Sequence, residues 1–284
     1  MLKFDVVMPT LNSVSRVGRK IFKMILKRIY SEIPVNRLLV VDDGSTDGTV
    51  EILREFNAVI IQGVGSLGKA REIGIRNVET EWFYFIDDDN LIPQQFHEKM
   101  WKHVNEKIGM IYPKSVIPFD NWLVRYEEVA RIFRKTCGLK EVAEIRGYTG
   151  ATLVRTRALS GINIPNIARY EDKYIKNYCE QKGWFVKYIP EIIVLHFHRD
   201  LLNYKTQYLE GYGMAKVRDI PRTRMIFSWL LTYPKSLIAY LYIRKTLLLK
   251  EVPKMYYMKY LGYSEALKSK RAQKHLNGNV TAKV

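Results

Sequence analysis

The first 90 residues alternate short apolar runs with longer segments in which apolar residues recur at helical spacing. The apolar runs carry few charges, which predicts buried strands at 4–8, 37–41, 58–61 and 82–86. Helical spacing is clearest after the first run, at Val17, Ile21, Met24, Ile25 and Ile29. Because strands and helices take turns along the chain, the pattern predicts an α/β fold with a mostly parallel, doubly wound sheet.

Polar turns follow the predicted strands. Thr10 and Asn12 follow the first strand, and Asp42 and Asp43 follow the second. Parallel strands end at one edge of a sheet, and open α/β sheets bind their ligands at that edge. We therefore expect these turns to line one pocket, together with the turn after residue 86.

That turn contains three consecutive acids, Asp87, Asp88 and Asp89. Adjacent carboxylates repel one another, and a chain with 46 Lys and Arg against 29 Asp and Glu does not need them for solubility. A divalent cation would relieve the repulsion. The alternative is an acidic turn that caps a following helix, whose start is marked by Pro93.

The composition is that of a packed globular protein, with 47% hydrophobic and 26% charged residues. The net charge of +17 implies an anionic partner, such as nucleic acid, a membrane surface or a phosphorylated ligand. The excess of positive charge lies mainly near the end of the chain, because 16 Lys and Arg but only 4 Asp and Glu follow residue 200.

The two cysteines and the N-terminus indicate the compartment. Cys137 and Cys179 do not have the spacing of a disulfide framework or a zinc site, so we expect both to be ordinary buried thiols. The chain enters its first predicted strand at Phe4, which leaves no room for a signal peptide. We therefore expect the protein to face the cytosol.

The region after residue 200 is apolar and aromatic as well as basic. Met225 to Ile243 is interrupted by Pro234 and Lys235, so each uncharged piece is shorter than the ~20 residues of a membrane span. We expect two shorter helices in the membrane interface, with cations among their tyrosines. The alternatives are a helical subdomain packed on the core, or nucleic-acid binding, for which no motif is present. From Ser269 on we expect a frayed polar tail.

Four segments combine these turns with recognisable motifs: MPTLNS at 8–13, VVDDGSTDGT at 40–49, GSLGKAREIGI at 65–75 and FIDDDN at 85–90. In order and spacing they resemble the nucleotide-sugar half of family 2 glycosyltransferases, whose GT-A fold is a Rossmann-like sheet flanked by helices. GATLVR at 150–155 resembles the acceptor-side strand of that family, and Tyr170-Glu171-Asp172 resembles its ED motif. Leu195-His196-Phe197-His198 resembles the segment in which some members place a metal-binding histidine.

The resemblance implies a set of donor-binding residues. Those expected at the base and ribose are Pro9, Thr10, Asn12, Asp42 and Asp43. Lys69 and Arg71 are expected at the nucleotide or its phosphates, which a guanidinium binds well. The alternatives are helix capping for Asp42 or Asp43, and a solvated helix face for Lys69.

The resemblance also implies a metal site for Mn²⁺ or Mg²⁺, both of which prefer oxygen ligands. Asp87 is expected to contact ribose or metal, Asp88 occupies the variable middle position beside the donor, and Asp89 is expected to bind the metal. His196 is a further candidate ligand. It alternates with His198 along a predicted strand, so the two share a face. A structural histidine is the alternative.

Asp172 is the candidate general base for the acceptor hydroxyl, and Glu171 lies beside it to orient the acceptor. The alternative is the first turn of a helix, where the helix dipole favours acids. Both interpretations can hold together, since a helix start can face a site.

These observations predict a metal-dependent inverting glycosyltransferase on the cytoplasmic face of a membrane. Residues 1–200 would be the GT-A catalytic domain, with the nucleotide-sugar half at 1–90 and the acceptor half at 91–200, and 201–284 a helical membrane-associating extension. We expect a UDP- or GDP-sugar donor, a lipid-linked or glycan acceptor and no nucleic acid. The alternatives are a sugar-phosphate nucleotidyltransferase, or a non-catalytic basic protein that binds membrane surfaces or nucleic acid.

Overall fold

The computed structural model describes residues 2–63, 65–120, 122–140, 142–197, 203–217 and 220–281. The chain divides into two compact units. The first comprises Met1–Phe119, Gly138–Asn166 and Glu171–Arg199, and the second comprises Asp120–Cys137, Ile167–Tyr170 and Asp200–Val284. The functional division into donor half, acceptor half and membrane-associating extension stays a prediction.

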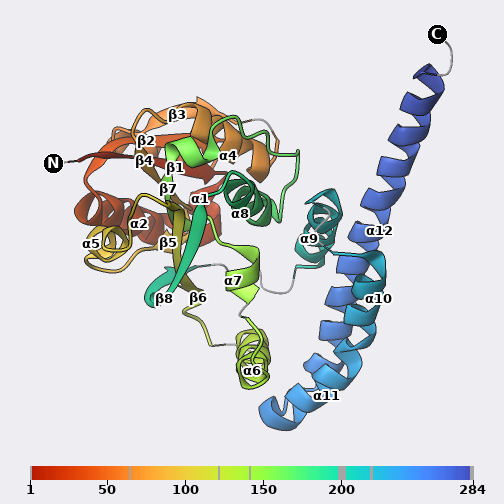
Figure 1. Cartoon of the computed structure of the whole chain (residues 1–284). Helices are drawn as coiled ribbons and strands as arrows, with labels where there is room; N and C mark the ends of the chain where they lie inside the picture. Colours follow the sequence, from red (N-terminus) through yellow and green to blue (C-terminus); the bar gives the residue numbers. More distant parts are fainter. Residues whose placement is uncertain are drawn as a thin grey trace. The chain divides into compact units, whose positions relative to one another are not determined.

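The first unit is built on an eight-stranded sheet in the order β3-β2-β1-β4-β7-β6-β8-β5 (Figure 1). Its strands are β1 (Phe4–Thr10), β2 (Val35–Asp42), β3 (Val59–Gln62), β4 (Trp82–Ile86), β5 (Asn90–Leu91), β6 (Ile108–Val116), β7 (Ala151–Arg155) and β8 (Phe185–His196). β1 to β4 pair in parallel, β7 runs antiparallel between β4 and β6, and β6 pairs in parallel with β8. The α/β prediction is therefore confirmed, including the four strands expected before residue 87.

Helices cover both faces of this sheet. The helices of this unit are α1 (Ser13–Val17), α2 (Arg19–Glu32), α3 (Thr49–Glu55), α4 (Leu67–Arg76), α5 (Phe96–Trp101), α7 (Val142–Arg146), the 3₁₀ helix η1 (Thr156–Leu159) and α8 (Glu171–Gln181). On β4, Trp82, Tyr84 and Ile86 join the core that includes α2 and α5, while Phe83 and Phe85 join the core that includes α4 and α8. Successive side chains of a strand point to opposite faces, so a strand covered on both sides is apolar throughout.

The described part of the second unit consists of helices and connecting segments: α6 (Trp122–Thr136), α9 (Tyr204–Val217), α10 (Arg222–Leu230), α11 (Thr232–Ile243) and α12 (Leu247–Thr281). The backbones of α9 and α12 nearly touch. A Cβ atom on Gly211 would lie 1.8 Å from the Lys259 carbonyl oxygen, and one on Gly262 would lie 1.9 Å from that of Tyr208. Only glycine permits this approach, which an ion pair between Lys259 and Glu210 (2.9 Å) also bridges.

Several sequence-based details of these segments are wrong. The two helices expected within 225–243 are present, but they are separated at Leu231. Pro234 lies in the first turn of α11, where its missing N–H has no intrahelical acceptor to lose. The tail expected to fray from Ser269 is helical through Thr281. Cys179 is buried as predicted, whereas Cys137 is exposed.

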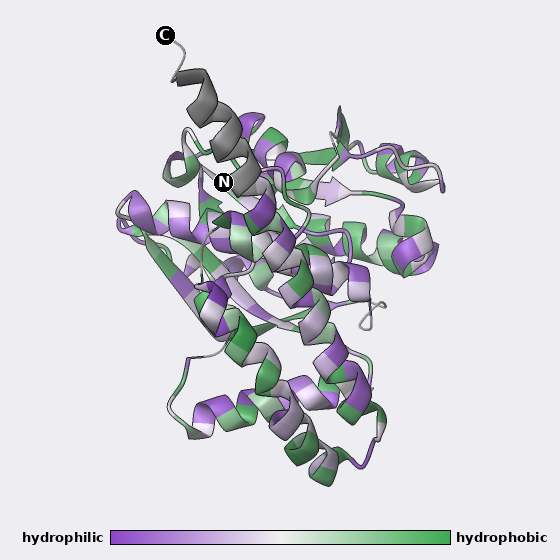
Figure 2. Ribbon diagram, turned by 90° about the vertical axis from the view of Figure 1, so that its right-hand side faces the viewer, coloured by the Kyte–Doolittle hydropathy of each residue, from purple (hydrophilic) through white to green (hydrophobic). Residues whose placement is uncertain are grey.

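Across the described ranges, none of the helices combines the length and the apolarity needed to cross a membrane. Coloured by hydropathy, the helical ribbons mix hydrophobic green with hydrophilic purple positions (Figure 2). The apolar segment expected within 225–243 is divided between α10, of 9 residues, and α11, of 12 residues.

Candidate functional site

The ends of β1 and β2 form one side of the site. Thr10 lies opposite Asp42 in the parallel register, and the Asp43 amide donates to the Thr10 carbonyl at 3.0 Å. The Asp42 carboxylate accepts hydrogen bonds from the Gly44 amide and from the amide and hydroxyl of Ser45, at 2.5–3.1 Å. These bonds close the turn after β2 and fix its carboxylate at the sheet edge.

The loops expected to bind the donor are joined by hydrogen bonds. Asn12 Oδ1 accepts from the Thr46 amide at 2.9 Å, and Asp43 Oδ1 accepts from the Gly65 amide at 2.8 Å. Pro9 is buried within β1, one residue before its end. The loops after β1, β2 and β3 therefore lie together at the carboxyl edge of the sheet, which for the first two is the position that the sequence predicts.

The capping alternatives for the acids are wrong. The N-cap of α3 is Gly48, so neither Asp42 nor Asp43 caps that helix. The N-cap of α5 is Gln95, so none of Asp87, Asp88 and Asp89 caps that helix. Helix capping therefore does not explain the acids after β2 and β4.

Asp88 is buried and fully engaged by the protein. Its carboxylate accepts hydrogen bonds from Thr10 Oγ1 at 3.1 Å, from the Ser13 hydroxyl, and from Arg16 Nη1 at 3.2 Å. Burial raises the pKa of Asp88 to about 6, although the nearby charge of Arg16 opposes this effect. Asp88 therefore connects the acidic turn to the start of α1.

Asp89 forms ion pairs with residues from two other segments of the chain. Arg16 Nη2 lies 2.8 Å and His196 Nε2 lies 3.2 Å from Asp89 Oδ2, while Asn90 Nδ2 donates to Oδ1 at 3.0 Å. Burial alone would lower the pKa of His196, but the Asp89 carboxylate outweighs it, so the pKa is raised. The structure thus brings the candidate ligands Asp89 and His196 together, whereas His198 lies outside the described residues.

Arg71 is a buried guanidinium shared by two acidic segments. Its Nη2 donates to both oxygens of Asp87 at 2.9 and 3.1 Å, and its Nε donates to Glu171 Oε1 at 3.3 Å. The guanidinium also lies 5.2 Å from the centre of the Phe85 ring. Burial raises the pKa of Asp87 despite this pairing. Glu171 Oε2 is buried and has no hydrogen-bond partner within the described ranges.

Asp172 lies beside Glu171 in the first turn of α8, and both acids are buried. Arg146 Nε donates to both Asp172 oxygens at 3.0 and 2.9 Å, and the Lys173 amide donates to Oδ1 at 2.8 Å. Burial raises the pKa of Asp172 to about 6, with Arg146 opposing the shift. A carboxylate with that pKa is ionised near neutral pH and is basic enough to accept a proton.

The Lys69 side chain contacts Glu72 and Asn163 and not the acidic turn. Its ammonium lies 2.8 Å from Glu72 Oε2 and 3.1 Å from Asn163 Oδ1. Ser66 caps α4 by accepting from the Lys69 amide. The structure therefore does not join Lys69 to the acidic turn, and a role in donor binding stays a prediction.

Sequence reasoning missed four residues of this network: Ser13, Arg16, Arg146 and Tyr148. Ser13 and Arg16 are three positions apart at the start of a helix, which places them on one face and was a usable signal. Tyr148 donates to Asn90 Oδ1 through its hydroxyl, and Arg146 comes from the last turn of α7. No local pattern marked those two, because their partners are distant in sequence.

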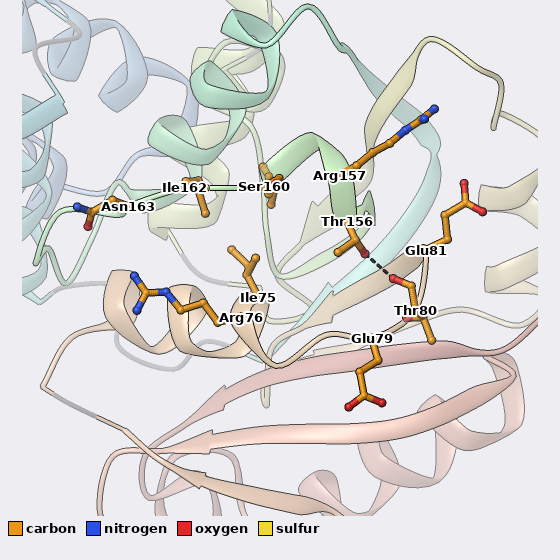
Figure 3. A pocket seen from close by; sticks show the side chains of 12 residues that line it. Ile75, Arg76, Glu79, Thr80, Glu81, Thr156, Arg157, Ser160, Ile162 and Asn163 are labelled. Atoms are coloured by element: carbon orange, nitrogen blue, oxygen red, sulfur yellow. Dashed lines mark hydrogen bonds between the residues drawn. The ribbon is translucent and has the colours of Figure 1, made fainter.

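A pocket of about 720 Å³ lies at the other end of β4. Thr80 and Glu81, which precede β4, and Thr156, which follows β7, lie along it (Figure 3). Thr156 Oγ1 donates to the Thr80 carbonyl at 2.6 Å and ties the two segments together. None of the residues expected at the donor or acceptor lines this pocket, so the candidate site and this pocket lie at opposite ends of β4.

The family model of glycosyl transferase family 2 matches residues 5–160, which is more than half of the chain. The glycosyltransferase GlyA of Streptococcus pneumoniae is 33% identical over 110 residues, covering 37% of this chain and 15% of that protein. The poly(ribitol-phosphate) beta-N-acetylglucosaminyltransferase TarS of Staphylococcus aureus is 28% identical over 102 residues, covering 34% and 18%. The matched part is thus less than a fifth of the length of either relative.

Solved structures extend the likeness beyond the matched residues. Glucosyl-3-phosphoglycerate synthase of Mycobacterium tuberculosis, in complex with Mn²⁺, UDP-glucose and phosphoglyceric acid, superposes with a TM-score of 0.55 at 17% identity. The superposition covers 78% of this chain and 81% of that one. Residues 1–349 of TarS superpose with a TM-score of 0.52 at 18% identity, covering 75% and 65%. The likeness confirms the predicted GT-A fold.

Proposed function

The chain belongs to glycosyl transferase family 2, and on that premise we propose a metal-dependent, inverting transfer of a sugar from a UDP- or GDP-sugar. The acceptor is a hydroxyl or phosphate of a lipid-linked molecule or glycan. One observation carries the proposal: buried Arg71 links Asp87 of the acidic turn to Glu171 at the start of α8. The proposed donor and acceptor sides therefore share one charged network. Family membership also favours this activity over the nucleotidyltransferase and the non-catalytic alternatives.

The residues at the acidic turn fit Mn²⁺ or Mg²⁺. Asp89, with Asp87 and His196 near it, would hold the ion, since hard cations favour oxygen ligands. No three acidic, histidine or cysteine side chains in the described part of the chain form a ready-made metal cage. None is required, because such ions commonly take one or two protein carboxylates and complete their shell with substrate phosphates and water. When bound, the ion would neutralise charge on the departing diphosphate.

Asp172 is the proposed general base. It accepts the proton of the acceptor hydroxyl while that oxygen bonds to C1 of the donor sugar, and the bond from C1 to the diphosphate oxygen breaks. This single displacement inverts the anomeric carbon. The buried position of Asp172 and its raised pKa of about 6 support the role. Arg146 holds both carboxylate oxygens and so orients the base.

Glu171 is proposed to orient the acceptor. Its Oε1 is held by Arg71, whereas its Oε2 is buried without a hydrogen-bond partner in the described part of the chain. A buried acceptor atom left unpaired costs roughly 1–3 kcal/mol. An acceptor hydroxyl that donates to Oε2 would remove that cost, which supports this assignment.

Calorimetric titration tests the donor side. We expect one of the UDP-, GDP- or dTDP-sugars to bind in the presence of Mn²⁺ and to lose at least ~10-fold in affinity when EDTA removes the metal, because the diphosphate then faces the acids without a counterion. As a comparison, the protein is incubated with a nucleoside triphosphate and a sugar phosphate, the substrates of a nucleotidyltransferase, and pyrophosphate is assayed. Release of pyrophosphate from that pair, or failure of every donor to bind the folded protein, would reject the proposal.

Arg16 provides a second, binding-only test. Its guanidinium pairs with Asp88 and Asp89, so it competes with a cation for the same carboxylates. Because its side chain is 45% exposed, we expect Arg16→Gln to raise the affinity for Mn²⁺ alone by only about two- to fivefold. Electron paramagnetic resonance of free Mn²⁺ measures this affinity, and Arg54→Gln, which changes an exposed arginine of α3, is the matched control. A lower Mn²⁺ affinity in Arg16→Gln would show that Arg16 supports the cation instead.

A further inference from the structure

Helix α11 buries its small residues and exposes its large apolar ones. Its buried side chains are Thr232, Ser236 and Ala239, all at most 1% exposed and spaced along one face. Its large apolar side chains at the surface are Tyr233, Leu237, Ile238, Leu241 and Tyr242, which are 49–77% exposed. A helix at the surface of a globular protein usually has the opposite arrangement, in which the large apolar side chains face the core.

The buried side chains of α11 have packing or hydrogen-bond partners. Ala239 packs with Leu248 and Val252 of α12 in one apolar cluster. The hydroxyls of Thr232 and Ser236 donate to carbonyl groups within the same helical region, at 2.5 and 2.6 Å. The inward face of α11 therefore has its partners within the described part of the chain, and the large apolar side chains lie on the other side of the helix.

The exposed apolar surface continues beyond α11. Phe227, Leu230 and Leu231 on and after α10, and Leu247 and Leu249 at the start of α12, are each at least 40% exposed. We call these five residues, together with the five exposed apolar residues of α11, the apolar face. All ten side chains lie on three consecutive helices and the residues that join them. Exposed apolar side chains concentrated in this way mark an interaction site, whereas single ones scattered over a surface do not.

The charges around the apolar face identify its partner. Residues 222–250 contain six Lys or Arg and no Asp or Glu. Arg222, Lys235, Arg244 and Lys245 are exposed at the ends of α10 and α11 or between apolar positions. Cations beside tyrosines and leucines suit the boundary between acyl chains and anionic headgroups. Neither α10 nor α11 is long enough to span, so both would lie in the plane of the interface.

We propose that the apolar face, formed by α10, α11 and the start of α12, docks on the surface of an anionic lipid bilayer. The leucine and tyrosine side chains enter the acyl boundary, and the flanking arginines and lysines contact lipid phosphates. The proposal does not depend on the sugar donor, so it can fail while the proposed function holds, or hold while that function fails.

Vesicle flotation of the full chain tests the docking. We expect binding to vesicles of phosphatidylcholine with 30% phosphatidylglycerol, and at least ~10-fold weaker partitioning for the double variant Leu237→Asn, Leu241→Asn. The matched control is Ile193→Asn, a similarly exposed apolar residue on β8 of the first unit. It should bind as the wild type does. Thermal unfolding verifies that each variant is folded, which is expected because the substituted side chains are exposed.

A second variant separates the contribution of the flanking cations from that of the apolar side chains. Arg244→Gln, Lys245→Gln should weaken binding to the anionic vesicles while changing residual binding to pure phosphatidylcholine by less than twofold. If the wild type does not bind anionic vesicles, or binds them equally after both leucines are replaced, the apolar face does not dock on lipid. The latter result would indicate adsorption by net charge alone.

Discussion

Replacement of Asp172 by Asn is expected to lower kcat by about 10²–10⁴-fold while leaving the affinity for the donor unchanged within about twofold. The amide retains the size of the carboxylate and can still contact Arg146, but it cannot accept a proton at pH 7. Donor affinity is preserved because none of the carboxylates near the proposed metal is altered. Steady-state kinetics and donor titration of the same preparation measure the two effects separately.

The pH profile gives an independent readout of the same residue. Since the pKa of Asp172 is raised to about 6, wild-type kcat/KM should fall as pH decreases through 6, where the base becomes protonated. The residual activity of Asp172→Asn should lack that inflection. Glu180→Gln, which changes an exposed acid on the same helix, is the matched control. If Asp172→Asn keeps normal kcat, or weakens donor binding as much as it lowers kcat, Asp172 is not the base.

Replacement of Asp89 by Asn is expected to reduce Mn²⁺-dependent donor binding and kcat/KM by at least ~100-fold. The carboxylate is central to the proposed cation site, being the shared partner of Arg16 and His196. An amide of the same shape keeps the hydrogen-bonded turn but removes the negative charge that a cation needs. Titration with Mn²⁺ and with the donor measures the loss.

Two comparisons make this second result specific. Glu51→Gln, an exposed acid in the first turn of α3, should leave metal and donor binding unchanged. Asp87→Asn should disturb the Arg71 network as well, so its effect should extend to the acceptor side. Full Mn²⁺ dependence in Asp89→Asn would assign the cation to other ligands.

The sequence predicts the first four strands well because each is a local signal. β4 has the expected bounds, and β1 to β3 differ by one or two residues at their ends. The antiparallel placement of β7 between β4 and β6 could not be read in this way. Its position depends on pairing between segments about 70 residues apart, which leaves no periodic mark in either segment.

In the candidate site, too, local sequence patterns predict some residues, whereas contacts between distant segments could not be predicted. The acidic turn and Arg71 stand out in sequence because they end or follow recognisable elements. That Arg71 contacts Glu171, 100 positions away, depends on the packing of α4 and α8 on one face of the sheet. Arg16 was not predicted as a site residue, because a single arginine on a helix is ordinarily solvated.

The two-sided packing of β4 has a consequence for how this protein can change over generations. Substitutions within Trp82–Ile86 alter one core at a time, because neighbouring side chains belong to different cores. Inserting or deleting a single codon would exchange the two sets of side chains and turn the carboxylates that follow to the opposite side. We therefore expect insertions and deletions of single residues to be tolerated in the surface loops but not within Trp82–Ile86.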